Sequence, residues 1–227
     1  MLKIIQNNKD WDCRNVMSQT KFYEGYSRWD EDKERYENWG ESVSRVMGMH
    51  RDYYTEKMSP ELSLLIDEAE SQYKLKYTLG AQRALQFGGE QLRKHMMRMY
   101  NCTSTYADRP RFFSELFYVL LCGAGAGFSV QKHHVAKLPQ VAERKKQAKG
   151  WQVADSIEGW ADSLGVLLSS YFTTDQQFPE FGGRKVYFDL NGVRPKGAMI
   201  NGGFKAPGPE PLRRALDKIE HILQTVV

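Results

Sequence analysis

The chain has 227 residues, of which 41% are hydrophobic and 12% aromatic, and its formal net charge is +4. This length suits one large domain or two small ones, and no run of about 18 apolar residues is present to span a membrane. Three cysteines, Cys13, Cys102 and Cys122, include no Cys-x-x-Cys pair, which argues against a disulfide scaffold or a cysteine-based zinc site. We therefore expect a reducing, cytoplasmic setting, and the N-terminal residues lack the apolar core of a secretion signal.

The first part of the chain has helical character, from residue 15 to about residue 88. The charged stretch 27–47 carries spaced aromatic residues, as an exposed helix does. Further on, Ser59 is expected to cap a helix that has Pro60 at its first position, and apolar residues then recur at helical spacing. We expect residues 1–88 to form a helical N-terminal region.

From residue 89 onward the pattern alternates between helices and short extended runs. This alternation predicts an α/β layer or barrel, although the strands are few for a closed barrel. Asp108 is expected to cap the first of these helices, and Asp155 with Glu158 has the spacing of a capping box at the start of a later one. The expected elements are a helix at 107–125, a strand at 127–131, a helix at 155–172, a strand at 185–190 and a helix at 211–223.

A glycine-rich stretch, LLCGAGAGFSVQKHH, occupies residues 120–134. It matches neither a dinucleotide fingerprint, which needs G-x-G-x-x-G between a strand and a helix, nor a Walker loop, which needs Gly-Lys-Ser/Thr. Since glycine has no Cβ, two interpretations remain: a plain helix-to-strand turn, or a backbone that lies close to a ligand. His133 and His134 are neighbours and would point to opposite faces of a strand, so we expect no metal site.

Three other segments carry alternatives. Cys102 stands just before an expected helix start, where it is either a small buried residue or a reactive thiol. The segment 193–211 is either a long connecting loop or, through Arg194, Lys196 and its paired glycines, a site for an anionic ligand ahead of a helix. The basic run 143–150 is interpreted as a solvated loop, so nucleic-acid binding is not expected.

Taken together, four stretches resemble, in order and spacing, the N-terminal half of class II, adenosylcobalamin-dependent ribonucleotide reductases. The resemblance covers about residues 20–225 and rests on YNC, DRPRFFSELFYVLLCGAGAGFSVQKHHVAKLPQV, ADSIEGWADSLGVLL and VRPKGAMINGGFKAPGPEPL. It implies a helical lead-in followed, over 89–227, by half of a ten-stranded α/β barrel. It also implies that Cys102 is the first of two cysteines that reduce the substrate and end as a disulfide.

The resemblance further implies two groups of binding residues. The backbone that lies close to the nucleotide substrate would be formed by Gly123, Ala124, Gly125, Ala126, Gly127, Phe128 and Ser129. The deoxynucleotide effector, and its link to substrate choice, would involve Asp108, Arg194, Lys196, Gly202 and Gly203.

The family's remaining catalytic parts have no counterpart in this sequence. They are a thiyl-forming Cys in an Asn-x-Cys-x-Glu context, the general-base Glu, the second redox Cys and most contacts to adenosylcobalamin. The resemblance therefore implies one piece of a split enzyme that is inactive alone and completed by a C-terminal half, with a thiol reductant. The small size, the missing regulatory cone domain and the split itself suggest a viral or phage origin. The alternative is a truncated relative that only binds effector nucleotides. Whether the substrate is a diphosphate or a triphosphate, and how the split arose, stay open.

Overall fold

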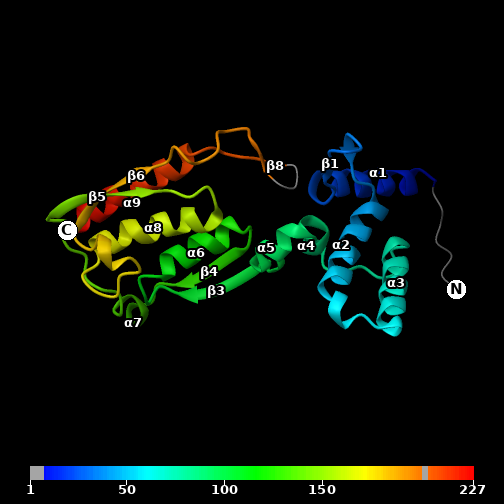
Figure 1. The fold of residues 1–227 in the computed structure, drawn as a ribbon, viewed down its shortest axis with the longest axis horizontal. Helices are drawn as coiled ribbons and strands as arrows, with labels where there is room; N and C mark the ends of the chain where they lie inside the picture. Colours follow the sequence, from blue (N-terminus) through cyan, green and yellow to red (C-terminus); the bar gives the residue numbers. More distant parts are fainter. Residues whose placement is uncertain (1–7, 201–203) are drawn as a thin grey trace. The chain divides into compact units, whose positions relative to one another are not determined.

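The computed structural model describes residues 8–200 and 204–227, and the chain divides into two compact units at Met99 and Tyr100 (Figure 1). We call them the N-terminal unit and the C-terminal unit. Of the described residues, none belongs to a helix that is both long and apolar enough to cross a membrane.

The N-terminal unit is mainly helical. Helices α2 and α3 pack on each other, α4 packs on α2, and their apolar faces form the core of the unit. Its elements are α1 (Asn8–Gly25), β1 (Trp29–Asp30), β2 (Arg35–Tyr36), α2 (Trp39–Tyr53), the 3₁₀ helix η1 (Thr55–Lys57), α3 (Pro60–Lys74), α4 (Gln82–Phe87), α5 (Glu90–Lys94) and the 3₁₀ helix η2 (Met96–Met99). The fully or nearly buried core residues are Val43, Val46, Met47, Ile66, Tyr73, Ala84 and Leu85.

Local hydrogen bonds explain where these helices begin. The prediction of a helix throughout 27–47 is wrong, because β1 and β2 form an antiparallel pair and the helix begins only at Trp39. A reciprocal capping box fixes this start of α2. Asn38 Oδ1 accepts from the Glu41 amide, and the Glu41 carboxylate accepts from the Asn38 amide. The prediction for α3 is confirmed, since the Ser59 side chain accepts from the Leu62 amide and Pro60 is the first helical residue.

The C-terminal unit is built on two parallel strand–helix–strand units. Strand β3 pairs with β4 across α6, and β5 pairs with β6 across α8. Helix α6 packs on β4 and α8, and α8 packs on β6 and α9 (Figure 1). Its elements are β3 (Cys102–Tyr106), α6 (Phe112–Leu121), β4 (Gly125–Ser129), α7 (Lys132–Val135), β5 (Lys146–Gln152), α8 (Ile157–Tyr171), the 3₁₀ helix η3 (Pro179–Phe181), β6 (Arg184–Asp189), β7 (Met199–Ile200), β8 (Phe204–Lys205) and α9 (Glu210–Val226).

Helix α8 is the centre of this unit because it is buried on nearly every side and mainly apolar. Val166 and Leu167 have no exposed surface, and Leu164, Leu168 and Tyr171 are buried on neighbouring turns. A helix that is hydrophobic all round must be covered by other elements, here α6, β6 and α9. The α/β class is confirmed, whereas the half of a ten-stranded barrel is not: within the described residues the strands pair only two by two.

Three local predictions in this unit are wrong. Asp108 does not cap α6, which begins at Phe112 without a side-chain cap. Asp155 does not cap α8: the Ser156 hydroxyl accepts from the Gly159 amide, one residue out of the expected register. The basic run expected to be a solvated loop forms most of β5, because its backbone pairs with β6 while its side chains remain exposed.

Candidate functional site

The parallel pairing of β3 and β4 places the predicted redox cysteine beside the predicted glycine platform. Cys102 is opposite Gly125 in the register, and Ser104 is opposite Gly127. Cys102 is exposed, and side-chain exposure alternates along β3 so that Cys102, Ser104 and Tyr106 are the exposed positions. Alternate residues of a strand share a face, so the thiol and the glycines belong to one open surface, which we call the Cys102 face.

The opposite side of this strand pair is covered by α6. Phe112 is 2% exposed, and its ring contacts the ring of Phe128 with the centroids 5.6 Å apart. Thr103 and Thr105 of β3 are half-buried, and Ala124, just before β4, is buried. Helix α6 thus supports the strand pair from behind and leaves the Cys102 face free.

The three glycines of the platform differ in what surrounds them. Gly123 has a φ of +86°, which glycine adopts without strain, and it turns the chain from α6 into β4. A Cβ on Gly125 would lie 3.5 Å from the Asn101 carbonyl oxygen, an ordinary contact, and a Cβ on Gly127 would meet nothing within 4 Å. The fold therefore explains the glycine at 123 but not the one at 127.

A polar cluster stands at the carboxyl end of the two strands. Ser129 Oγ lies 3.0 Å from His134 Nδ1, and the His134 ring lies against Tyr106 with the centroids 4.5 Å apart. Partial removal from water, and then the neighbouring charge of His133, lower the pKa of His134, so its neutral form is favoured. Within the described residues no three His, Cys, Asp or Glu side chains gather as metal ligands do.

The predicted effector residues occupy two separate places. The Asp108 carboxylate pairs with Arg109 at 2.9 Å and lies 3.9 Å from the Lys137 ammonium, whereas Arg194 Nε donates to Asp155 at 2.6 Å. The segment around Lys196 is closed by a hairpin, in which the Gly197 amide donates to the Ala206 carbonyl. Gly202 and Gly203 lie outside the described residues.

Sequence reasoning placed Cys102 wrongly and missed two of its neighbours. Cys102 is the first residue of a strand rather than the residue before a helix. Ser104 and Tyr106 share its exposed face and were not singled out. The signal was present in the alternation of Cys-Thr-Ser-Thr-Tyr, whose β-branched residues at every second position are typical of a half-buried strand.

Comparison with known proteins shows relatives of one kind. The family model described as B12-dependent ribonucleotide reductase, insertion domain, matches residues 128–223. The adenosylcobalamin-dependent ribonucleoside-triphosphate reductases of Lactobacillus delbrueckii subsp. bulgaricus and Lactobacillus leichmannii are each 30% identical to the chain, covering 87% of it and 34% of the relative. The corresponding protein of Lacticaseibacillus paracasei is 27% identical over 89% of the chain and 35% of its own length.

A solved structure supports the same relationship. The crystal structure of a B12-dependent (class II) ribonucleotide reductase superposes with a TM-score of 0.76 and 26% sequence identity, covering 92% of this chain and 37% of that one. The chain therefore spans about a third of the length of the relatives that it matches. Sequence and fold agree over nearly the whole of this chain.

Proposed function

Because the chain belongs to the family of class II, adenosylcobalamin-dependent ribonucleotide reductases, we propose that it is the N-terminal part of such an enzyme. In this proposal the first half of the family's ten-stranded barrel includes β3 and β4. A second polypeptide supplies the radical-forming cysteine and the general base, and the chain alone does not turn over substrate. The single observation that carries the proposal is the register that sets the exposed Cys102 beside Gly125.

The chemistry of the Cys102 face suits reduction by a pair of thiols. Converting a ribonucleotide to a deoxyribonucleotide replaces one ribose hydroxyl by hydrogen and releases water, which consumes two electrons and two protons. Two cysteine thiols supply both when they join in a disulfide, and an external thiol reductant restores them. We propose Cys102 as one of the two and the completing polypeptide as the source of the other.

Substrate would lie along β4 in this arrangement. The open space beside Gly127 admits a ligand to the backbone, where amide and carbonyl groups are available as hydrogen-bond partners. Ser104, opposite Gly127, and Ser129, opposite Tyr106, contribute hydroxyls to the strand pair. For the effector we propose the region of Asp108, together with Arg194, Lys196, Gly202 and Gly203.

The relatives are named for adenosylcobalamin, and we propose the same cofactor for the completed enzyme. It supplies the radical when bound. The residues around Cys102 do not fit a corrin site on their own, because Cys102, Ser104 and Gly127 form an exposed face rather than an enclosed cavity. Cofactor binding is therefore assigned mainly to the completing polypeptide.

The test is reconstitution with a polypeptide that carries the rest of a class II enzyme. With adenosylcobalamin, a ribonucleoside triphosphate and a dithiol, the pair is expected to form deoxynucleotide, and Cys102→Ser to abolish turnover while co-purification is unchanged. Cys13→Ser is the matched control, since Cys13 is also exposed but lies in the other unit. Turnover retained by Cys102→Ser would remove its redox role. Effector binding without any reconstitution would favour a truncated relative that only binds nucleotides.

A further inference from the structure

The N-terminal unit contains a cavity whose walls come from α1, the start of α2 and the segment after α3. Its volume is about 550 Å³, which is within the range of small-molecule sites. Its lining residues belong to the N-terminal unit, whereas the Cys102 face belongs to the C-terminal unit. The lining residues that matter below are Lys21, Phe22, Trp39, Tyr73, Lys76 and Gln82.

Aromatic rings form one side of this cavity. Trp39 stands between Phe22 and Tyr73, with ring centroids 5.7 Å away on either side. Tyr73 is buried, but Phe22 and Trp39 are only half-buried and so keep ring surface open to the cavity that they line. Such rings offer a planar ligand a stacking surface, which is worth about 1–3 kcal/mol for a nucleobase on an aromatic side chain.

The charges on the cavity wall are of one sign. Two lysines line it, and none of the described lining residues is a carboxylate. Lys21 is paired with Glu24 at 3.0 Å, so its charge is already balanced. Lys76 has no carboxylate partner in the described part of the chain, and its ammonium lies 5.1 Å from the centroid of the Trp39 ring. An anion entering here meets one uncompensated positive charge directly beside the aromatic wall.

Lys76 is held in this position by an unusual backbone. Helix α3 ends in a Schellman motif, in which the Tyr77 amide donates to the Gln72 carbonyl and the Lys76 amide to that of Tyr73. The left-handed residue of this motif is usually glycine, yet here it is Lys76, with a φ of +62°. A side chain at such a position is strained, and strain of this kind is concentrated at ligand sites. Lys76 therefore lowers the stability of the fold relative to a glycine at this position, and a contact with a ligand would explain why a lysine stands there.

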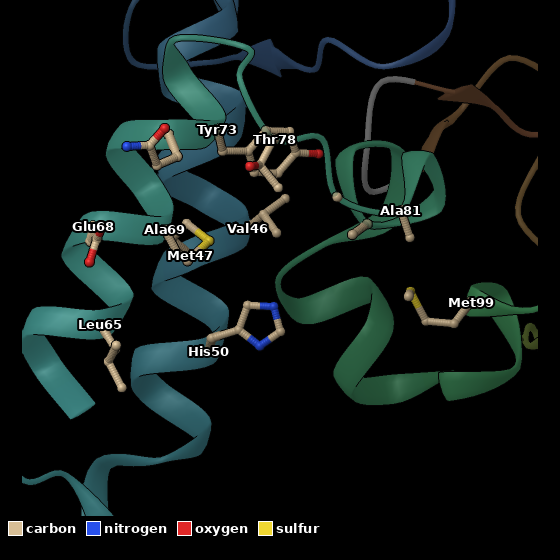
Figure 2. Close-up of a pocket in the computed structure, with 13 residues that line it drawn as sticks. Val46, Met47, His50, Leu65, Glu68, Ala69, Tyr73, Thr78, Ala81 and Met99 are labelled. Carbon is tan, nitrogen blue, oxygen red and sulfur yellow. The ribbon is translucent and has the colours of Figure 1, made fainter. Parts of the chain in front are cut away.

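A second cavity on the other side of Tyr73 lacks the combination of half-buried aromatic rings and a lysine that lines the first. The second cavity, of about 500 Å³, shares Tyr73 and Gly80 with the first and is shown in Figure 2. Its walls are mostly aliphatic side chains and methionines, such as Val46, Met47 and Leu65, and its charged lining residue is Glu68. That cavity does not combine an open aromatic surface with a lysine that could pair with an anion.

We propose that the cavity between α1 and α2 binds a planar aromatic anion of the size of a nucleoside monophosphate. The ligand's aromatic ring lies against Phe22, whose ring plane is inclined by 69° to that of Trp39, and the anionic group pairs with the Lys76 ammonium over the Trp39 ring. Gln82 Oε1 already accepts from the Tyr26 hydroxyl at 2.9 Å, which leaves the Gln82 amide hydrogens for the edge of the ring system. This site goes beyond the proposed reductase function and does not depend on it.

Isothermal titration of the full 227-residue chain with adenosine monophosphate tests the proposal, with adenosine and inorganic phosphate as partial ligands. Binding of the monophosphate is expected, with both partial ligands at least about tenfold weaker because each lacks one of the two contacts. Lys76→Met is expected to weaken binding by roughly tenfold or more, the usual effect of losing a charge-assisted contact. Lys74→Met, which removes a charge two residues earlier and outside this cavity, leaves it unchanged.

A second variant separates binding from folding. Lys76→Gly relieves the left-handed strain, so the melting temperature is expected to stay equal or rise while binding is lost. Absence of monophosphate binding at millimolar concentration would overturn the proposal. Equal weakening by Lys74→Met and Lys76→Met would also overturn it, as would loss of binding on Asp108→Asn, which would place the ligand in the C-terminal unit. Cys102→Ser is expected to bind normally, so this result stands apart from the reductase test.

Discussion

Gly127 and Glu70 differ in whether the fold of this chain accounts for the residue type at their position. Gly127 has free space where a side chain would stand, so packing within this chain does not require glycine there. Glu70 is the reverse case, a carboxylate whose partners are all internal. Its oxygens accept from Ser44 and pair with Arg51 and Lys74 at 2.6 Å.

Gly127→Ala is expected to leave the fold intact and to reduce turnover of the reconstituted enzyme at least roughly tenfold, since a methyl group would stand where substrate is proposed to lie. The thermal midpoint of the chain alone and the rate of deoxynucleotide formation measure the two effects. Gly150→Ala is the matched control, because Gly150 is also an exposed glycine in a parallel strand with nothing within 4 Å of its Cβ position. Equal rates for the two variants would mean that no ligand approaches β4 closely.

The acid stability of the N-terminal unit should depend on Glu70. Burial alone would raise the pKa of Glu70, but hydrogen bonds from Lys74, Ser44 and Arg51 outweigh it and lower the pKa from 4.5 to about 2. A depressed carboxyl pKa contributes stability that is complete above about pH 4.5 and is lost as the pH falls towards 2. Urea unfolding at about pH 7 and about pH 2.5 measures the free energy of unfolding on either side of this loss.

Glu70→Gln is expected to lower the free energy of unfolding by about 1 kcal/mol at neutral pH, and the difference from the unmodified chain should shrink at about pH 2.5. Glu68→Gln, an exposed position on the same helix, serves as the control and should change little. A difference between Glu70→Gln and the unmodified chain that stays constant with pH would contradict the assignment.

Three helices, α2, α3 and α8, begin where a side-chain oxygen accepts from an otherwise unpaired backbone amide. Ser59, Asn38 and Ser156 each accept from an amide in the first turn of α3, α2 and α8. Such caps are worth about 1 kcal/mol each, because the first amides of a helix otherwise have no partner. The sequence predicts Asp155 as the cap of α8, but the Asp155 side chain pairs with Arg194 and the adjacent Ser156 caps the helix.

Ser156→Ala should therefore destabilise the C-terminal unit by about 1 kcal/mol, since the Gly159 amide loses its acceptor. Asp155→Ala removes only a partly exposed ion pair and is expected to cost roughly 0.5 kcal/mol or less. Chemical denaturation followed by circular dichroism compares the two. The opposite ranking would show that Asp155 caps α8 in solution.

The whole molecule consists of two units with separate cores. Val43 lies in the core of the N-terminal unit and Val166 in that of the C-terminal unit, and neither has exposed surface. Substitutions in cores that share no partners add independently. The Cys102 face and the proposed aromatic cavity are thus supported by different packing.

Val43→Ala and Val166→Ala are each expected to cost roughly 2 kcal/mol through lost contacts and the cavity left behind. In differential scanning calorimetry each variant should shift a different unfolding transition, and the double variant should shift both. The loss of unfolding free energy in the double variant should equal the sum of the two single losses to within about 0.5 kcal/mol. A single transition moved by both substitutions would mean that the two units unfold together.

The local elements could mostly be predicted from the residues alone. Ser59 with Pro60 marked the start of α3, and the apolar spacing of α8 and α9 marked their extents, because these signals act within a few residues. Three predictions failed: the hairpin inside 27–47 was missed, and the caps expected at Asp108 and Asp155 do not form. The two aspartates pair with Arg109 and Arg194 instead, so their oxygens have partners other than helix amides.

The sequence by itself determined the family, the helical N-terminal region and the residues worth testing, above all Cys102 and the glycines from Gly123 to Gly127. Only the tertiary structure decided that these two segments are neighbours, since the whole of α6 separates Cys102 from Gly125 along the chain but a parallel register joins them in space. It also decided which side of the strand pair is open. That side is free because the apolar face of α6 covers the other one, an outcome of packing between distant segments that no local pattern contains.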